Sequence, residues 1–318
     1  MIAVSRFFKL TLCGGLVVLA WLTQLPSAFA GERSNMPEYF YQPSLGIIAL
    51  SIEAHEDMGS PTYSINSLSG TNLSSTTVGD TGYSLTCNYG FTDAWSLDAK
   101  AGIDTNTYDN TPANGTDTQT TASGFNDYVV GISNATQMAG WNLHVGIHVG
   151  ISPGKQLLPS LTANGNNHSG GTSLENYLGF SYLLGGGFAG AKLSYTTLMQ
   201  RTSNANTSGA QDASTNGGNI TALSAFYELE PGGGFEFDVS GTYDFSDPAS
   251  SIYSDGSTSS VDAHKVLLLG AGAEEQFTSN FNIRVAYQMA FNPTYNVNGY
   301  QEGAYSASQL SGRVRFEF

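Results

Sequence analysis

The clearest pattern along the chain is an alternation of apolar and polar residues over stretches of about ten residues, the length that a tilted strand needs to cross a lipid bilayer. In residues 141–151 every odd position is apolar and every even position is polar or glycine. Residues 235–245 repeat the pattern, with acidic residues between aromatic and aliphatic ones. Successive side chains of a β-strand point to opposite sides, so a period of two predicts strands with one apolar face.

Twelve segments of this kind are predicted as strands. They cover residues 45–55, 81–90, 94–104, 125–136, 141–151, 173–183, 188–198, 219–229, 235–246, 263–275, 281–290 and 305–318. Five connections are short, as at 231–234. Six are long and rich in Ser, Thr, Asn, Gly and Asp, near 56–80, 105–124, 152–172, 199–218, 247–262 and 291–304. This alternation of lengths predicts an all-β, antiparallel transmembrane β-barrel of about twelve strands, with short periplasmic turns and long extracellular loops.

Aromatic residues support this interpretation. Five strands begin with a large ring, each 46 or 47 residues after the previous one, at Trp95, Trp141, Phe188, Phe235 and Phe281. Such a series is typical of an aromatic belt at one membrane interface. Phe188 breaks the alternation of its segment, so either a bulge lies there or its ring points inward. A soluble β-propeller also repeats at about 45 residues, but it packs four short strands into each repeat, whereas here two long strands fill it.

Composition narrows the class of protein. Only 12% of the residues are charged, about half of what a soluble domain carries, while glycine, tyrosine and phenylalanine are abundant. The formal charge of −15 argues against nucleic acid as a partner, since phosphate contacts need clustered Lys and Arg. After residue 30, Cys87 is the single cysteine, and no Cys/His cluster indicates a metal or another cofactor. We therefore predict neither.

The first 30 residues have the features of a secretory signal peptide. Arg6 and Lys9 precede an apolar stretch at 10–22, and small residues end the segment, which predicts cleavage after Ala30. An uncleaved anchor helix is the alternative. The predicted organisation is a signal peptide at 1–30, a periplasmic N-terminal segment at 31–44 and the barrel at 45–318.

The C-terminus carries a resemblance to a known class. Leu310, Gly312, Val314, Phe316 and Phe318 occupy alternate positions up to a terminal phenylalanine. This resembles the C-terminal assembly signal of Gram-negative outer-membrane β-barrel proteins, a class that includes porins and transporters. The resemblance implies a place in the bacterial outer membrane, among its lipid and lipopolysaccharide. It also implies recognition of the two phenylalanines by the barrel-assembly machinery.

In each predicted strand, the positions between the apolar ones point to the other side of the wall. This places charged side chains in the lumen. The predicted lumen-lining residues are Asp98, Lys100, His144, His148, Lys192, Glu236, Asp238, Asp244, Arg284, Arg313 and Arg315. We expect the three arginines on the wall opposite the acidic residues, which would give a transverse field. A twelve-stranded barrel is wider than the eight-stranded kind that side chains fill, so a passable lumen is expected; a lumen plugged by ion pairs is the alternative.

These features favour a passive channel or small-solute transporter with a weak preference for cations. A structural or surface-interacting barrel that does not conduct is the alternative, followed by an outer-membrane hydrolase. Glu53 with His55, and Asp262 with His264, bring a carboxylate and an imidazole to one strand face, which is adequate for activating water. They match no hydrolase motif, so an enzyme is not predicted.

Two metal-site hypotheses fail on spacing. His144 and His148 are four residues apart on one strand, which separates them by roughly 13 Å, too far for one ion. The loop acids Asp104, Asp109 and Asp117 lack the spacing of a calcium loop.

Overall fold

The structure is a computed structural model that describes residues 38–58, 62–66, 72–112, 115–138, 140–159, 164–205, 212–298 and 300–318. The predicted signal peptide and its cleavage point after Ala30 lie outside the described residues. No helix in this part of the chain is both long and apolar enough to cross a membrane.

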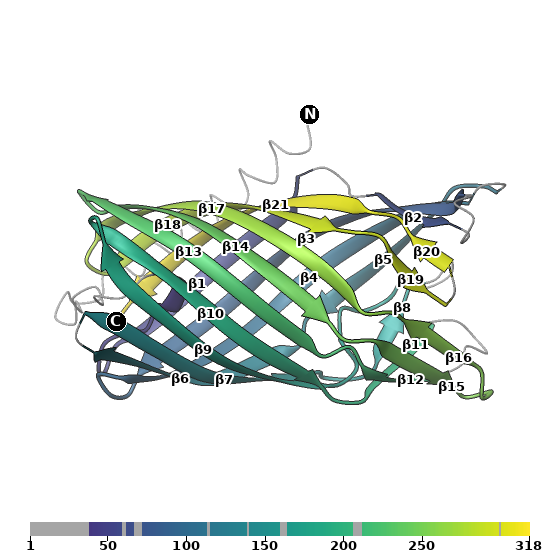
Figure 1. The fold of residues 1–318 in the computed structure, drawn as a ribbon, viewed down its shortest axis with the longest axis horizontal. Helices are drawn as coiled ribbons and strands as arrows, with labels where there is room; N and C mark the ends of the chain where they lie inside the picture. Colours follow the sequence, from purple (N-terminus) through teal and green to yellow (C-terminus); the bar gives the residue numbers. More distant parts are fainter. Residues whose placement is uncertain are drawn as a thin grey trace.

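The described residues form a closed antiparallel barrel of twelve long strands (Figure 1). These are β1 (Ile48–Asp57), β3 (Asn72–Gly90), β4 (Trp95–Pro112), β6 (Tyr128–Met138), β7 (Trp141–Ile151), β9 (Thr172–Leu184), β10 (Gly187–Leu198), β13 (Ile220–Gly232), β14 (Phe235–Ser246), β17 (His264–Thr278), β18 (Phe281–Asn292) and β21 (Tyr305–Glu317). Each pairs with the next, and β1 pairs with β21, which closes the sheet. The predicted fold class is confirmed.

The two faces of the barrel wall differ as the alternation predicts. Outward apolar side chains are exposed, for example Leu193 at 51%, Leu223 at 58% and Val239 at 56%. Inward neighbours such as Ser224 and Glu236 are buried. An apolar exterior around a polar interior is the reverse of a soluble protein, and it suits a wall that faces lipid.

Phe188 resolves the alternative left by the sequence. β10 pairs with β9 and β13 without a register shift, so no bulge lies there. The side chain of Phe188 is 8% exposed and belongs to an apolar cluster inside the barrel. Its ring therefore points inward, and it is not part of the aromatic belt.

The two ends of the barrel are different. At one, which we call the short-turn end, tight turns such as the one between β13 and β14 join the strands. At the other, the loop end, nine shorter strands extend the wall (Figure 1). These are β2 (Thr62–Asn66), β5 (Thr118–Phe125), β8 (Gln156–Leu158), β11 (Arg201–Ala205), β12 (Asp212–Gly217), β15 (Ala249–Tyr253), β16 (Thr258–Val261), β19 (Tyr295–Val297) and β20 (Tyr300–Glu302). The sequence predicted loops here, because polar residues on both faces leave no alternation to read.

The N-terminal segment lies inside the barrel at the short-turn end. A 3-10 helix, η2 (Glu38–Phe40), precedes β1 and is seen within the barrel in Figure 1. The side chains of Phe40 and Gln42 are buried. The sequence placed 31–44 in the periplasm outside the barrel; the structure puts the described part of that segment in the lumen.

The topology can be tested with epitope tags. A tag inserted after Asp117, in the connection between β4 and β5, should be labelled by antibody on intact cells, because this connection belongs to the loop end. A tag at Gly233, between β13 and β14, should be labelled only after the outer membrane is permeabilised. Labelling of the Gly233 tag on intact cells would invert the whole barrel.

The lipid-facing position of Cys87 predicts an energetic cost for a charge. Cys87 pairs with Leu50 and Ala99 and shares parity with the exposed Leu85. Cys87→Arg should lower the unfolding free energy in lipid vesicles by about 2–4 kcal/mol, as measured by urea titration. Asn88→Arg, one residue along and facing the lumen beside Asp98, is the control. Equal losses for both variants would contradict the assignment.

Candidate functional site

Charged and aromatic side chains inside the barrel fall into three groups along its length. The first surrounds the N-terminal segment at the short-turn end, the second forms ion pairs midway along the wall, and the third lies toward the loop end.

The N-terminal segment is held by an aromatic cluster. The ring of Phe40 stacks on the imidazole of His144 with 3.9 Å between centroids, and it meets Phe226 edge-on at 5.5 Å. Tyr39 stacks on the other side of this cluster, 4.5 Å from the ring of Phe226. Phe40, Phe188 and Phe226 make a small apolar core within an otherwise polar lumen, and Tyr177 packs against it.

Glycine in the barrel wall makes room for the segment. Gly179 on β9 faces Phe40, and a Cβ atom at this position would overlap the ring. Any larger residue would push Phe40 away from His144. The wall and the segment are therefore matched in shape at this point.

Polar contacts fix the rest of the segment. The backbone N–H of Tyr39 donates to Glu228 at 3.1 Å, and the Gln42 amide donates to the Ser133 hydroxyl at 2.9 Å. The hydroxyl of Tyr41 donates to Glu317 at 2.8 Å. The Arg315 guanidinium lies 3.8 Å from the centroid of the Tyr41 ring. The segment thus occupies the short-turn end with both apolar and charge-assisted contacts.

One mid-barrel network is centred on His148. Its Nε2 lies 3.3 Å from Asp98 and its Nδ1 lies 2.9 Å from Glu175. Lys192 pairs with Glu175 at 3.0 Å, and its ammonium lies 4.5 Å from the centroid of the Tyr177 ring. Three residues predicted to line the lumen, Asp98, His148 and Lys192, are thereby brought together.

The second network corrects the expected arrangement of charges. Arg284 pairs with Asp238 at 2.7 Å, and Glu274 accepts from Arg313 at 2.6 Å and from Arg315 at 3.2 Å. From the sequence, we expected the arginines opposite the acidic residues, across the pore. They lie instead on β18 and β21, close to β14 and β17, and they neutralise the acids locally. Arg284 therefore lies beside Asp238 and not across the lumen from it.

The remaining predicted residues differ in their surroundings. Glu236 and His144 are buried, each 1% exposed. Lys100 is exposed and Asp244 is half-buried. Glu236 pairs in the sheet with Glu274, the acid of the second network, while His144 stacks on Phe40.

A polar cavity lies beside the second network. It has a volume of about 260 Å³, and its lining includes Glu53, Asp238, Arg284, Gln309 and Arg313. A smaller cavity of about 100 Å³ continues toward the N-terminal segment and touches Tyr39 and Phe226. Space for water therefore exists along the lumen above the segment.

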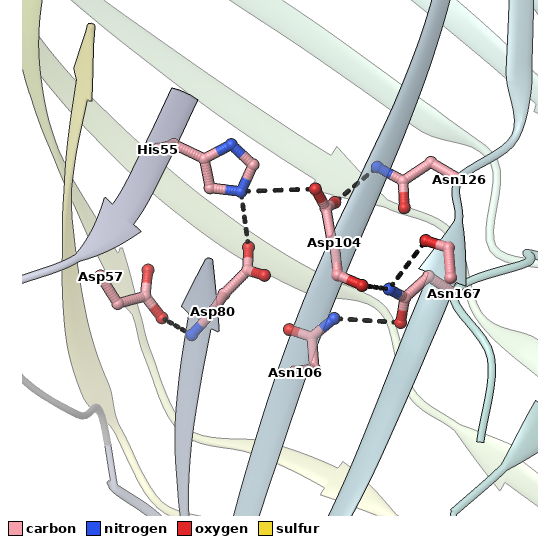
Figure 2. A network of polar contacts seen from close by, with 8 residues as sticks. His55, Asp57, Asp80, Asp104, Asn106, Asn126 and Asn167 are labelled. Atoms are coloured by element: carbon pink, nitrogen blue, oxygen red, sulfur yellow. Dashed lines mark hydrogen bonds and ion pairs between the residues drawn. The ribbon is translucent and has the colours of Figure 1, made fainter. Parts of the chain in front are cut away.

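The third group lies toward the loop end and contains His55, which faces Asp80 and Asp104 (Figure 2). From the sequence, we expected this imidazole to share a strand face with Glu53. At the other predicted carboxylate–histidine pair, Asp262 accepts from Asn296, while His264 stacks on Tyr295 at 4.8 Å. Neither of the two predicted pairs shows a carboxylate oxygen in contact with its imidazole.

The fold matches a solved outer-membrane channel from Pseudomonas putida F1. The two share a TM-score of 0.58 at 11% sequence identity, over 89% of this chain and 99% of that chain. The chain has the fold of an outer-membrane β-barrel. The NanC porin (TM-score 0.41, 13% identity, 84% of this chain and 98% of that) and a FadL homologue from Pseudomonas aeruginosa (0.41, 9%, 85% and 90%) are less similar. No protein-family model matches the sequence, and neither does any curated protein.

The aromatic cluster predicts how the N-terminal segment can be released. Phe40→Ala removes the ring that joins His144 to Phe226, and truncating a buried Phe costs about 3–5 kcal/mol. The segment should then leave the lumen and become sensitive to protease in the folded, detergent-solubilised barrel. Tyr41→Phe, which removes a single hydroxyl, is the control. Equal protease resistance of Phe40→Ala and wild type would show that the ring does not hold the segment.

Proposed function

We propose that this chain is an outer-membrane channel for small hydrophilic solutes whose short-turn end is closed by its own N-terminal segment. The observation that carries the proposal is the polar cavity of about 260 Å³ between Glu53, Asp238, Arg284 and Arg313. Charged side chains around this space suit a hydrated path better than a packed interior, since a buried charge needs water or a partner.

A weak preference for cations is part of the proposal. Acidic side chains facing the lumen include Glu53, Asp80, Asp98, Asp104 and Asp244, in addition to those held by arginine. Local ion pairing reduces this excess without reversing it. An acidic lumen raises the local concentration of cations, and salt screens the effect.

The N-terminal segment would act as the gate. It lies between the cavity and the short-turn end, and three side-chain hydrogen bonds and one aromatic cluster hold it. Solute passage would require the segment to shift toward the periplasm, since its connection to β1 is at that end.

A non-conducting structural barrel is the second candidate. The same segment favours it, because a stably held plug would leave no continuous path. In this case the extended hairpins of the loop end would provide the functional surface.

We propose the bacterial outer membrane as the location, after removal of the signal peptide at Ala30. The seam of the barrel, where β21 pairs with β1, fits an assembly role for Phe316 and Phe318. Phe316 stacks between Phe281 and Phe318, at 5.1 and 6.4 Å, and the backbone N–H of Phe318 donates to Ile48 at 2.9 Å. Recognition of this strand by the barrel-assembly machinery would precede formation of the seam.

Single-channel recording on the refolded mature protein tests the gate. Wild type should show small or intermittent currents, and deletion of residues 38–44 should raise the conductance because the lumen is cleared. The same deletion should leave the heat-modifiable mobility of the barrel on gels unchanged. If neither protein conducts, the structural-barrel proposal is preferred.

Selectivity is tested by reversal potentials in a salt gradient. Asp238→Asn with Asp244→Asn should shift the reversal potential of the gate-deleted channel toward anions, since both changes remove lumen acids. Lys100→Gln should shift it the other way. An anion preference in the parent channel would mean that the arginines dominate the path.

A further inference from the structure

Three side chains toward the loop end of the lumen have the arrangement of a metal site. His55 on β1, Asp80 on β3 and Asp104 on β4 each offer one ligand atom, and these atoms lie within 4.8 Å of one another. Neighbouring strands bring them together, and Figure 2 shows the imidazole facing both carboxylates. Among the described residues, this is the one such group of His, Cys, Asp or Glu.

Both carboxylates approach the same ring nitrogen. Nε2 of His55 lies 3.1 Å from Oδ2 of Asp80 and 3.7 Å from Oδ1 of Asp104. At His148 the two acids instead contact opposite nitrogens, so each ring N–H of an imidazolium has its own acceptor. One N–H at His55 cannot point at two acceptors well. A cation between the three atoms contacts all of them.

The distances suit a small transition-metal ion. Zinc binds His nitrogen and carboxylate oxygen at about 2.0–2.2 Å in tetrahedral geometry, so two ligands of one ion lie roughly 3.3–3.6 Å apart. The separations of 3.1 and 3.7 Å from Nε2 need adjustments of only a few tenths of an ångström, and all three ligand atoms lie within 4.8 Å of one another. An imidazole ligand favours zinc and its neighbours over calcium and magnesium, which prefer oxygen alone.

Unsatisfied atoms and a glycine that lets the side chains approach mark the same point. Oδ1 of Asp80 and Oδ1 of Asp104 are buried and have no hydrogen-bond partner. Gly82 lies across from both His55 and Asp104 in the sheet, and a Cβ atom there would overlap both side chains. Buried polar atoms without partners are uncommon, and an ion bound beside Nε2 would satisfy Oδ1 of Asp104 and bring positive charge close to the carboxylate of Asp80.

Outer contacts orient the ligands. Oδ2 of Asp104 accepts from the Asn126 amide at 2.5 Å, and the backbone carbonyl of Asp104 accepts from Asn167 (Figure 2). The backbone N–H of Asp80 donates to Asp57 at 2.9 Å. Such partners fix the direction of a metal ligand and are typical of metal sites.

We propose that His55, Asp80 and Asp104 bind a divalent transition-metal ion, with Zn²⁺ as the best-fitting occupant. Two carboxylates and a neutral imidazole carry a charge that a divalent ion cancels. The side chains are 18%, 23% and 17% exposed, so the ion enters from water in the lumen. The site stands on this geometry alone and does not require that the barrel conducts.

Calorimetric titration of the folded, detergent-solubilised protein with Zn²⁺ tests the site. Wild type should bind one ion, and His55→Gln, Asp80→Asn and Asp104→Asn should each weaken binding at least about tenfold. Gly82→Ala should also weaken it, although it removes no ligand. His264→Gln, which changes a histidine beside Asp262 at the same end of the barrel, is the matched control and should bind like wild type. Heat-modifiable mobility on gels shows which variants fold.

Wild-type crystals soaked in Zn²⁺ keep the proposal testable if variants fail to fold. An anomalous peak at the zinc edge is expected between the three side chains. No saturable binding by wild type, a peak elsewhere only, or binding that His55→Gln leaves unchanged would overturn the proposal.

Discussion

The structure depends on the hydrogen bonds between β1 and β21. In a lipid environment a strand edge has no water to bond with, and every unpaired N–H or C=O costs several kcal/mol, so a sheet must close. Here the backbone of Ile48 exchanges two hydrogen bonds with that of Phe318, at 2.9 and 3.0 Å. Once the seam is closed, the apolar side chains face outward, and the polar ones have no place but the lumen.

A barrel closed by twelve strands has a wide interior, and the side chains in its lumen must satisfy one another. The interior is too wide for the wall's own residues to fill, yet its charges need partners. Arginine and acid residues on nearby strands pair along the wall, as at Arg284 and Asp238, and leave a cavity between them. The N-terminal segment supplies what the wall lacks at the short-turn end, with Phe40 packed against rings from β7 and β13.

The sequence predicts the wall well, because a membrane enforces the alternation of side chains. β7 and β14 begin and end at the predicted residues, since lipid contact makes each outward position apolar. Above the membrane this constraint disappears, and the strands of the loop end were missed. The position of the N-terminal segment inside the barrel was not predicted, because the residues that contact it lie far apart in the chain. Phe188 and Phe226 carried a signal, since each is apolar at a lumen-facing position.

The charge pairs and the metal cluster depend on register, which alternation cannot supply. Gly82 lies opposite both His55 and Asp104, so Asp80 comes within reach of them only diagonally across β3. The spacing in the chain gives no hint of this. Similarly, Asp238 on β14 and Arg284 on β18 are separated by a single strand, and only the pairing through β17 shows that they meet.

The seam also sets an order of events in time. Its two halves are the first and last strands of the barrel to be synthesised, so no growing chain contains both until translation is nearly complete. Until β21 is present, one edge of β1 therefore has no strand to pair with. A chain cut short anywhere before β21 would keep that edge, and its wall could not close in the way seen here.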